Sequence, residues 1–158
     1  MAKKSKQSDN QIARNKRALF DYHIEETFEA GIQLLGWEVK SIRAGKANLS
    51  DAYVIIRDGQ GYLLNTHIAP LNSASTHIIV DSNRTRKLLL HKKELAKIYG
   101  VLGQKGRACV PLEMYWKGFL VKLKIGLAKG KKAHDKRDAI RDREWNVEKQ
   151  RALRQRIR

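Results

Sequence analysis

The strongest constraint on the fold is a pair of alternating segments joined by a tight turn near residue 117. Apolar residues occupy even positions before Lys117-Gly118 and odd positions after it. The two series are Ala108, Val110, Leu112, Met114 and Trp116, then Phe119, Val121, Leu123, Ile125 and Leu127. A period of two is typical of β-strands with one buried face, and glycine suits the turn. The pattern predicts an antiparallel hairpin in which Lys122 and Lys124 point away from the core.

Two further segments predict additional strands. Residues 20–34 alternate in the same way, which predicts a long half-buried strand with Glu29 on its outward phase. Asp58-Gly59 lies between two apolar runs and predicts a second hairpin over residues 52–68. We therefore expect five or six strands, mostly antiparallel.

Short helices and a loop are predicted between these strands. Apolar residues at helical spacing predict helices over 36–46 and 87–99, with Gly45 and Gly100 placed to end them. Residues 71–85 are rich in Ser, Asn, Asp and Thr and predict a loop around a short strand at Ile78–Val80. Long antiparallel strands with short helical connections favour a small barrel over a sandwich. We expect a mostly β fold with short helices, an OB-like (oligonucleotide-binding-type) antiparallel barrel over residues 18–128.

Both ends of the chain are basic extensions. Residues 1–17 contain six Lys or Arg and one Asp, and residues 129–158 contain twelve Lys or Arg and five Asp or Glu. The apolar residues of the second segment scatter around a helical wheel, so a helix there has no broad apolar stripe to bury. We expect an N-terminal arm over 1–17 and a tail over 129–158 that is disordered alone and folds as a helix on an anionic partner. Gly130 is the expected hinge.

The net charge of +17 indicates a polyanionic partner. Nucleic acid is the first choice, and an anionic membrane surface is the second, weaker because no amphipathic helix combines a basic face with an apolar one. The apolar runs are too short to cross a bilayer, and the N-terminus is polar, which favours a cytoplasmic protein.

The residues that usually carry catalysis or bind metals show no recognisable arrangement. The five histidines have no metal-ligand spacing with one another or with the lone Cys109. Nucleophile, nucleotide-binding and dinucleotide motifs do not occur in the sequence. We expect no enzyme, no metal and no cofactor.

Several outward or unburied residues are candidates for RNA contact. Lys122 and Lys124 project from one strand face and can each neutralise a phosphate, although ordinary solvated lysines would give the same pattern. Glu29 is either a solvated surface residue or an acceptor for the exocyclic amines of C or G. In the tail, His134 can stack on a base, and Trp145 lies in a segment without a core, where a tryptophan needs a partner surface.

These features occur within a series of sequence blocks that follow one another over nearly the whole chain. The blocks are Asn15-Lys16-Arg17-Ala18, Phe28-Glu29-Ala30-Gly31, Gly36-Trp37-Glu38-Val39-Lys40-Ser41, Arg43-Ala44-Gly45-Lys46-Ala47-Asn48, Ser75-Thr76-His77, Arg84-Thr85-Arg86-Lys87-Leu88-Leu89-Leu90, Tyr115-Trp116, Ala128-Lys129-Gly130-Lys131-Lys132, His134-Asp135-Lys136-Arg137 and Arg143-Glu144-Trp145. In this order they resemble one family, the bacterial SsrA-binding proteins (small protein B), partners of transfer-messenger RNA. The match is loosest at Leu153 to Arg158.

The resemblance implies an RNA-binding adaptor. Such a protein binds the tRNA-like domain of transfer-messenger RNA, carries it to stalled ribosomes for trans-translation, and stands in for the missing codon–anticodon helix. The resemblance ties Glu29, Leu89 and Lys122 to RNA binding and places Tyr22 and Lys124 close to them. It assigns one set of tail residues to the ribosomal decoding centre and the empty mRNA channel: Gly130, His134, Asp135, Lys136, Arg137 and Trp145.

The role of Leu89 rests on the resemblance alone, because the sequence pattern places this residue in an apolar run. The expected partners are transfer-messenger RNA and the ribosome, without a membrane, and the expected bound form is a monomer. The alternatives are an RNA-processing enzyme and a basic structural protein of the ribosome.

Overall fold

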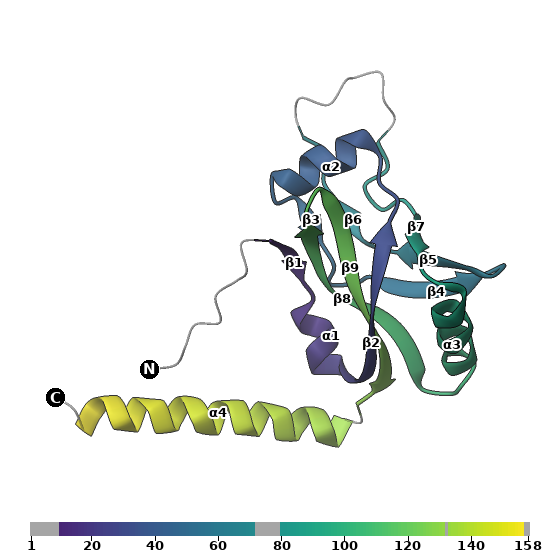
Figure 1. Cartoon of the computed structure of the whole chain (residues 1–158). Helices are drawn as coiled ribbons and strands as arrows, with labels where there is room; N and C mark the ends of the chain where they lie inside the picture. The colour runs from purple at the N-terminus through teal and green to yellow at the C-terminus, as the bar shows by residue number, and fades with distance from the viewer. Residues whose placement is uncertain (1–9, 72–79, 132, 157–158) are drawn as a thin grey trace.

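The computed structural model describes residues 10–71, 80–131 and 133–156 (Figure 1). The predicted hairpin is present in it as two long central strands. Strands β8 (Arg107–Lys117) and β9 (Leu120–Gly130) pair antiparallel over their whole length. Lys122 is half-buried and Lys124 is exposed, while Leu123 between them is fully buried. The two lysines therefore point outward, as their phase predicts.

The remaining long strands complete an antiparallel barrel. β9 pairs with β2 (Tyr22–Ile32), which pairs with β7 (Arg86–Leu89), and the order continues through β5 (Gln60–Leu64) to β4 (Tyr53–Arg57). β4 then meets β8 where Val54 lies opposite Cys109, and this contact closes the ring. The expected mostly β, OB-like antiparallel fold with short helices is confirmed.

The β4–β5 turn is also as predicted. Asp58 and Gly59 both have positive φ angles, 51° and 70°, which is the conformation of a two-residue hairpin turn of type I′. The second strand is shorter than expected, because Asn65 also has a positive φ, 59°. Beyond it, β6 (His67–Ile68) leaves the barrel and pairs with β3 (Ala47–Asn48) in a separate two-stranded sheet.

The helices occupy the connections, and one differs from expectation. α2 (Gly36–Arg43) lies within the predicted range, but α3 is Lys92–Leu102, later than the predicted 87–99. Residues 86–89 are β7 instead, because Leu88 is buried between β5 and β2. The helix starts after His91, whose backbone N–H donates to the Glu94 carboxylate. The predicted strand at Ile78–Val80 lies outside the described residues, apart from Val80 itself.

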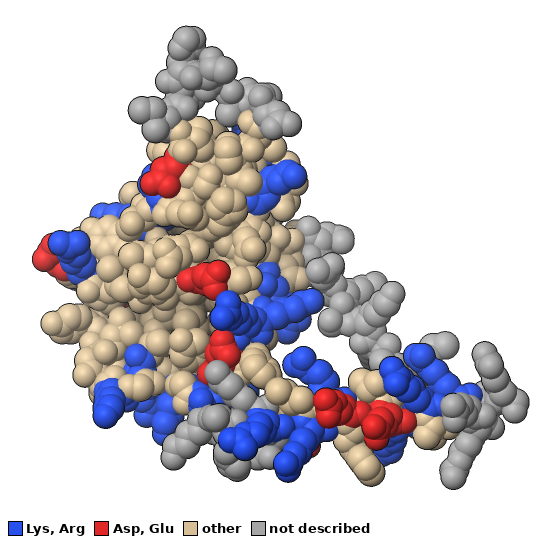
Figure 2. Space-filling model, turned by 180° about the vertical axis from the view of Figure 1, so that it is seen from behind, with Lys and Arg blue, Asp and Glu red and all other residues tan. Residues whose placement is uncertain are grey.

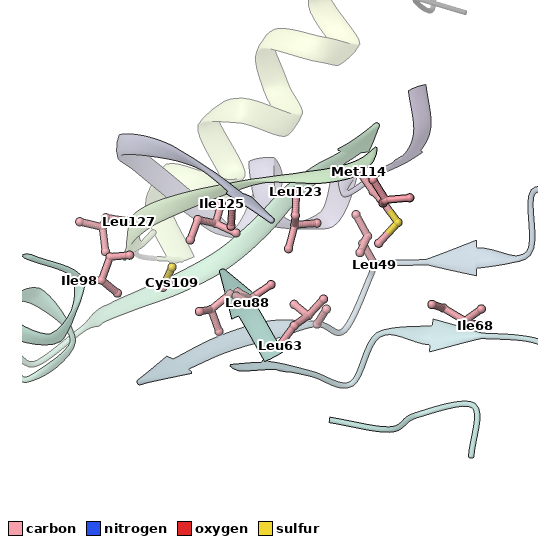
Figure 3. Packing of buried hydrophobic residues seen from close by; sticks show 14 of the residues in the cluster. Leu49, Leu63, Ile68, Leu88, Ile98, Cys109, Met114, Leu123, Ile125 and Leu127 are labelled. Atoms are coloured by element: carbon pink, nitrogen blue, oxygen red, sulfur yellow. The ribbon is translucent and has the colours of Figure 1, made fainter. Parts of the chain in front are cut away.

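Buried residues form two clusters rather than the single apolar face predicted for β8. Met114 and Cys109 belong to the main core, whereas Val110 and Leu112 pack in a smaller cluster with Ala18. The main core is shown in Figure 3. The change follows from a bulge between Pro111 and Glu113, because one extra residue moves the side chains before it to the opposite face.

The smaller cluster lies under α1 (Lys16–Asp21), so the folded domain begins before residue 18. β1 (Gln11–Arg14) pairs with β8, and the buried side chain of Asn15 caps α1. Its Oδ1 accepts from the Ala18 N–H at 3.0 Å, and its Nδ2 donates to the Pro111 carbonyl at 2.8 Å. Residues 10–17, expected to belong to a basic arm, are therefore attached to the barrel by paired backbone and a buried cap.

A buried ion pair links α2 to the barrel. Glu38 and Arg86 are both fully buried, and the Arg86 Nε donates to one carboxylate oxygen of Glu38. The other oxygen accepts from Arg84 and from the Leu35 N–H, which begins the helix. Arg86 also donates to the Thr66 carbonyl at 2.7 Å. Buried charges are tolerated when they are paired and hydrogen-bonded in this way.

The tail contains a long helix, α4 (Ala133–Arg156), which extends away from the barrel in Figure 1. Every side chain of α4 that the structure describes is exposed, so the helix buries no apolar stripe. In the described parts of the chain, no helix is both long and apolar enough to cross a membrane.

Candidate nucleic-acid interface

The outward side chains of β2, β9 and β8 form one surface, which we call the barrel face: Glu29, Tyr115, Lys117, Lys122 and Lys124. Antiparallel pairing places these residues next to one another, because Glu29 lies opposite Lys124 and Lys122 lies opposite Tyr115. Opposed residues share one side of the sheet at about 4.5–5.5 Å between their Cβ atoms. These five side chains supply three ammonium groups, one carboxylate and one phenol, and the half-buried Glu113 opposite Lys124 adds a second carboxylate beside them.

Glu29 is held by two neighbours on β8. The Tyr115 hydroxyl donates to its Oε2 at 2.5 Å, and the Lys117 Nζ donates to its Oε1 at 3.0 Å. These two hydrogen bonds, with the positive charge of Lys117, lower the pKa of Glu29 below its usual value, so the group is a carboxylate at neutral pH. Burial, followed by the bond to Glu29, raises the pKa of Tyr115 to about 12, so its hydroxyl keeps its proton.

Leu89 brings an apolar surface to the same place. It is 51% exposed at the end of β7 and lies opposite Gly31 of β2. A Cβ at Gly31 would lie 3.1 Å from the Leu89 Cβ, so the two strands approach closely because residue 31 is glycine. Leu89, Glu29 and Lys122 together line a hollow of about 530 Å³. The structure thus brings together the three residues that the resemblance tied to RNA binding.

A second hollow, of about 620 Å³, lies on the other side of Glu29. Lys124, Tyr115 and Lys117 line it, with Thr27 on β2. Glu29 therefore separates two recesses that both contain cationic side chains and both open to solvent. Cations can contact phosphates, a carboxylate can accept from base amines, and an exposed leucine offers an apolar surface, so these side chains are chemically suited to a folded RNA.

Tyr22 does not belong to this group. It begins β2 opposite Gly130, seven residues before Glu29, which is roughly 20 Å along a strand. Its half-buried side chain packs against the smaller apolar cluster and lines a different hollow with Arg17 and Tyr53. The expectation that Tyr22 lies close to the other barrel residues is therefore wrong, because strand direction carries it to the opposite end of β2.

The start of the tail is fixed to the barrel. Gly130 is still part of β9, and its N–H donates to the Gly106 carbonyl at 3.1 Å. Lys131 follows, with its N–H donating to the Asp21 carbonyl at 3.0 Å and its Nζ to the Leu19 carbonyl at 3.3 Å. Among the described residues, the last backbone hydrogen bond between the tail and the rest of the domain is therefore made by Lys131, one residue beyond the expected hinge at Gly130.

The predicted tail residues follow this attachment point along α4. His134, Asp135 and Lys136 lie in the first turns of the helix, and their side chains lie outside the described part of the structure. Arg137 and Trp145 are exposed, with 69% of Trp145 accessible. These two are eight positions apart on the helix, which is about 12 Å along its axis. The tail residues therefore form an extended series and are not gathered at the barrel face.

Basic side chains are concentrated along α4 and beside it (Figure 2). In Figure 2, Lys and Arg gather along α4 and around the end of the barrel from which it leaves, with fewer charges over the upper part of the molecule. Within the described parts of the chain, no group of three or more His, Cys, Asp or Glu is arranged to hold a metal ion.

Sequence reasoning missed Tyr115 and Lys117 as members of the site. Both lie on the outward, odd-numbered phase at the end of β8, where Tyr115 faces Lys122 across the hairpin. The alternation that identified Lys122 as outward contained the same information for its partner. What the sequence did not indicate is that Glu29, 86 residues from Tyr115, lies within hydrogen-bonding distance of it.

Comparison with known proteins gives a consistent result. The family model described as "SmpB protein" matches residues 12–155. An SsrA-binding protein of Psychrobacter sp. (strain PRwf-1) is 57% identical over 157 residues, which is 99% of both chains. That of Pseudomonas paraeruginosa is 59% identical over 154 residues, covering 98% of this chain and 97% of the relative.

A solved structure described as "tmRNA-SmpB: a journey to the center of the bacterial ribosome" has the same fold. It superposes with a TM-score of 0.66 at 47% identity, covering 81% of this chain and 93% of that one. Family model, full-length relatives and fold agree, and the chain belongs to the SmpB family of SsrA-binding proteins.

Proposed function

We propose that this chain is an RNA-binding adaptor of trans-translation. It binds the tRNA-like domain of transfer-messenger RNA and brings it to stalled ribosomes, where α4 occupies the decoding centre and the empty mRNA channel. Names of relatives support this function: they are SsrA-binding proteins, and the solved relative is described with tmRNA and the bacterial ribosome. The adaptor acts in the cytoplasm, where the ribosomes are. It binds the RNA as a monomer and catalyses no reaction.

The observation that carries the RNA-binding part is the convergence of Glu29, Leu89 and Lys122 around one hollow. These residues come from β2, β7 and β9, so only the folded barrel unites them. The lysines supply phosphate contacts, and the half-exposed leucine offers an apolar surface to a base or ribose. Glu29 supplies selectivity, because a carboxylate accepts from base amines but repels phosphates.

The ribosomal part is supported by the form of α4. The helix has 24 residues, which is about 36 Å, and it leaves the barrel at Lys131 with its described side chains exposed. A basic helix without an apolar stripe cannot pack against a protein core, but its cationic side chains can contact the phosphates that line an RNA channel. His134, Asp135, Lys136, Arg137 and Trp145 act there, beyond Gly130 at the end of the barrel.

Salt dependence of binding tests the barrel face. Binding of the tRNA-like domain is measured at several salt concentrations for the wild type, Lys122→Ala and the control Lys105→Ala. Lys105 is an exposed cation in the turn before β8, next to Gly106, whose carbonyl accepts from the Gly130 N–H at the end of the barrel where the tail begins. Losing one phosphate contact should reduce the slope of log K against log salt concentration by about 0.7–0.9 for Lys122→Ala and leave it unchanged for Lys105→Ala. Equal slopes in all three proteins would remove Lys122 from the RNA interface.

A further inference from the structure

The hydrogen bonds around Glu29 suggest how this carboxylate achieves selectivity. We propose that Tyr115, assisted by Lys117, is a positioning residue that fixes the Glu29 carboxylate as an acceptor for the amino group of an unpaired base. The inference rests on the proposed function and adds to it the residues that determine specificity. It gives Tyr115 no direct contact with the RNA.

The geometry leaves Glu29 free to accept further hydrogen bonds. A carboxylate has about four acceptor positions on its two oxygens. Tyr115 takes one position on Oε2 and Lys117 takes one on Oε1, so each oxygen keeps an unused lone pair. The side chain is 40% exposed and stands between the two hollows of the barrel face. The remaining lone pairs are therefore available to a base that enters either hollow.

Tyr115 is better suited than Lys117 to hold the carboxylate still. Tyrosine has two side-chain torsions before its hydroxyl, and Tyr115 is half-buried in β8. Lys117 is 65% exposed and has four torsions, and exposed ion pairs of this kind contribute little because the lysine must be ordered. The tyrosine therefore supplies most of the fixation, and the lysine mainly supplies charge.

Titratable groups surround Glu29 on the neighbouring strands. On β8 these are Tyr115, Lys117 and Glu113, and on β9 they are Lys122 and Lys124. The hydrogen bonds from Tyr115 and Lys117, with the charges of Lys117 and Lys122, favour the ionised form of Glu29 and lower its pKa. Lys87, His91 and Glu94, from β7 and the start of α3, line the hollow that Glu29 shares with Leu89 and Lys122. Among the groups that lower the pKa of Glu29, the Tyr115 hydroxyl has the largest effect, followed by Lys117. Removing the hydroxyl therefore affects both the orientation and the ionisation of Glu29.

A double-mutant cycle tests the proposal. Discrimination is measured as the ratio of Kd values for an elongator tRNA and for the tRNA-like domain of transfer-messenger RNA. The proteins are the wild type, Glu29→Gln, Tyr115→Phe, the double variant, and Tyr99→Phe as control. Tyr99 is an exposed tyrosine on α3, so its variant removes a hydroxyl outside the barrel face.

The expected results follow from Tyr115 acting through Glu29. Tyr115→Phe should reduce discrimination about 5–10-fold, as expected for the loss of one hydrogen bond of ordinary strength, and Tyr99→Phe should leave it unchanged. Once Glu29 is replaced by Gln, removing the hydroxyl should cause less than a twofold further change. If Glu29→Gln leaves discrimination intact, the assigned role of Glu29 fails and the inference fails with it. If Glu29→Gln reduces it but Tyr115→Phe does not, or if their effects simply multiply, only the inference is overturned.

A second readout separates positioning from a packing role. The pKa of Glu29 in the free protein is followed by NMR of its side-chain carboxyl carbon. Since Tyr115 lowers this pKa, Tyr115→Phe should raise it towards the ordinary value of 4.5. Discrimination should accordingly disappear at a higher pH in the variant than in the wild type as the pH is lowered. An unchanged Glu29 pKa in a folded Tyr115→Phe protein would contradict the inference.

Discussion

Replacing Glu38 by alanine should destabilise the barrel more than any loss of a surface ion pair. The substitution leaves Arg86 fully buried without its carboxylate and removes the acceptor for Arg84 and for the Leu35 N–H at the start of α2. Removing one partner of a buried pair typically costs about 3–5 kcal/mol, because the remaining charge keeps its desolvation penalty. The total free energy of unfolding of a domain of this size is about 5–15 kcal/mol, so the variant should lose a large part of its stability.

Urea unfolding measures this loss. At a slope of about 2 kcal/mol per molar urea, a loss of 4 kcal/mol lowers the midpoint by about 2 M. The matched control is Glu26→Ala, which removes the exposed pair with Lys97 and should cost at most about 1 kcal/mol. Replacing Glu38 and Arg86 together by Leu and Met should recover much of the loss, since no charge is then left buried. A Glu38→Ala midpoint within 0.5 M of the Glu26→Ala midpoint would refute this reasoning, with 0.5 M being about 1 kcal/mol at that slope.

Three further predictions concern buried residues elsewhere in the fold. Gly126→Val should lower the unfolding free energy by about 1–3 kcal/mol in urea titrations, because a Cβ there lies only 2.9 Å from Ile24 and 3.0 Å from Leu112; an unchanged midpoint would show that the cluster can expand. Asn15→Ala should cost about 1–3 kcal/mol in the same assay, since it removes the α1 cap and a buried bond to β8, and a loss below 0.5 kcal/mol would contradict the assigned cap. Burial raises the pKa of the Cys109 thiol to about 12, so at pH 8 this thiol should react with a disulfide reagent at least tenfold faster after unfolding than before it; equal rates would contradict its burial.

Strand phase was the most informative property of the sequence. The β8–β9 hairpin, the type I′ turn at Asp58-Gly59 and the outward direction of Lys122 and Lys124 all followed from alternation and turn residues. These features depend on neighbours in sequence or on one pairing, so a single chain is enough to predict them.

The same reasoning failed where one residue changes the phase. The bulge at Leu112 places Val110 in a different cluster from Met114, although both occupy even positions. The alternation continues through the bulge, and the signal that was available, Pro111 at the register shift, was not used: proline lacks an N–H for the strand ladder and is confined within sheets to edges and bulges. The prediction of one apolar face for β8 was therefore only half correct.

Residues that act through distant partners were the other source of error. Leu89 has its place because β7 pairs with β2 at Gly31, and the local pattern of residues 87–99 gave no reason to prefer a strand over a helix. Glu38 and Arg86 form one ion pair in the core although they are 48 positions apart in the sequence. Such pairs depend on tertiary contacts that hydrophobic periodicity does not contain.

The measurement that tests the two-surface account most directly is rescue by a protein without its tail. Because Lys131 still bonds to Asp21 and Leu19, the chain should be stopped after Lys131, which leaves the barrel and its face complete. We predict that this form binds the tRNA-like domain with a Kd within about twofold of the full-length value but supports little alanine transfer on stalled ribosomes. Full-length protein should promote transfer on truncated messages and progressively less as the mRNA extends past the A site into the space for α4. Rescue by the truncated protein equal to that of the full chain, or transfer independent of mRNA length, would contradict the account.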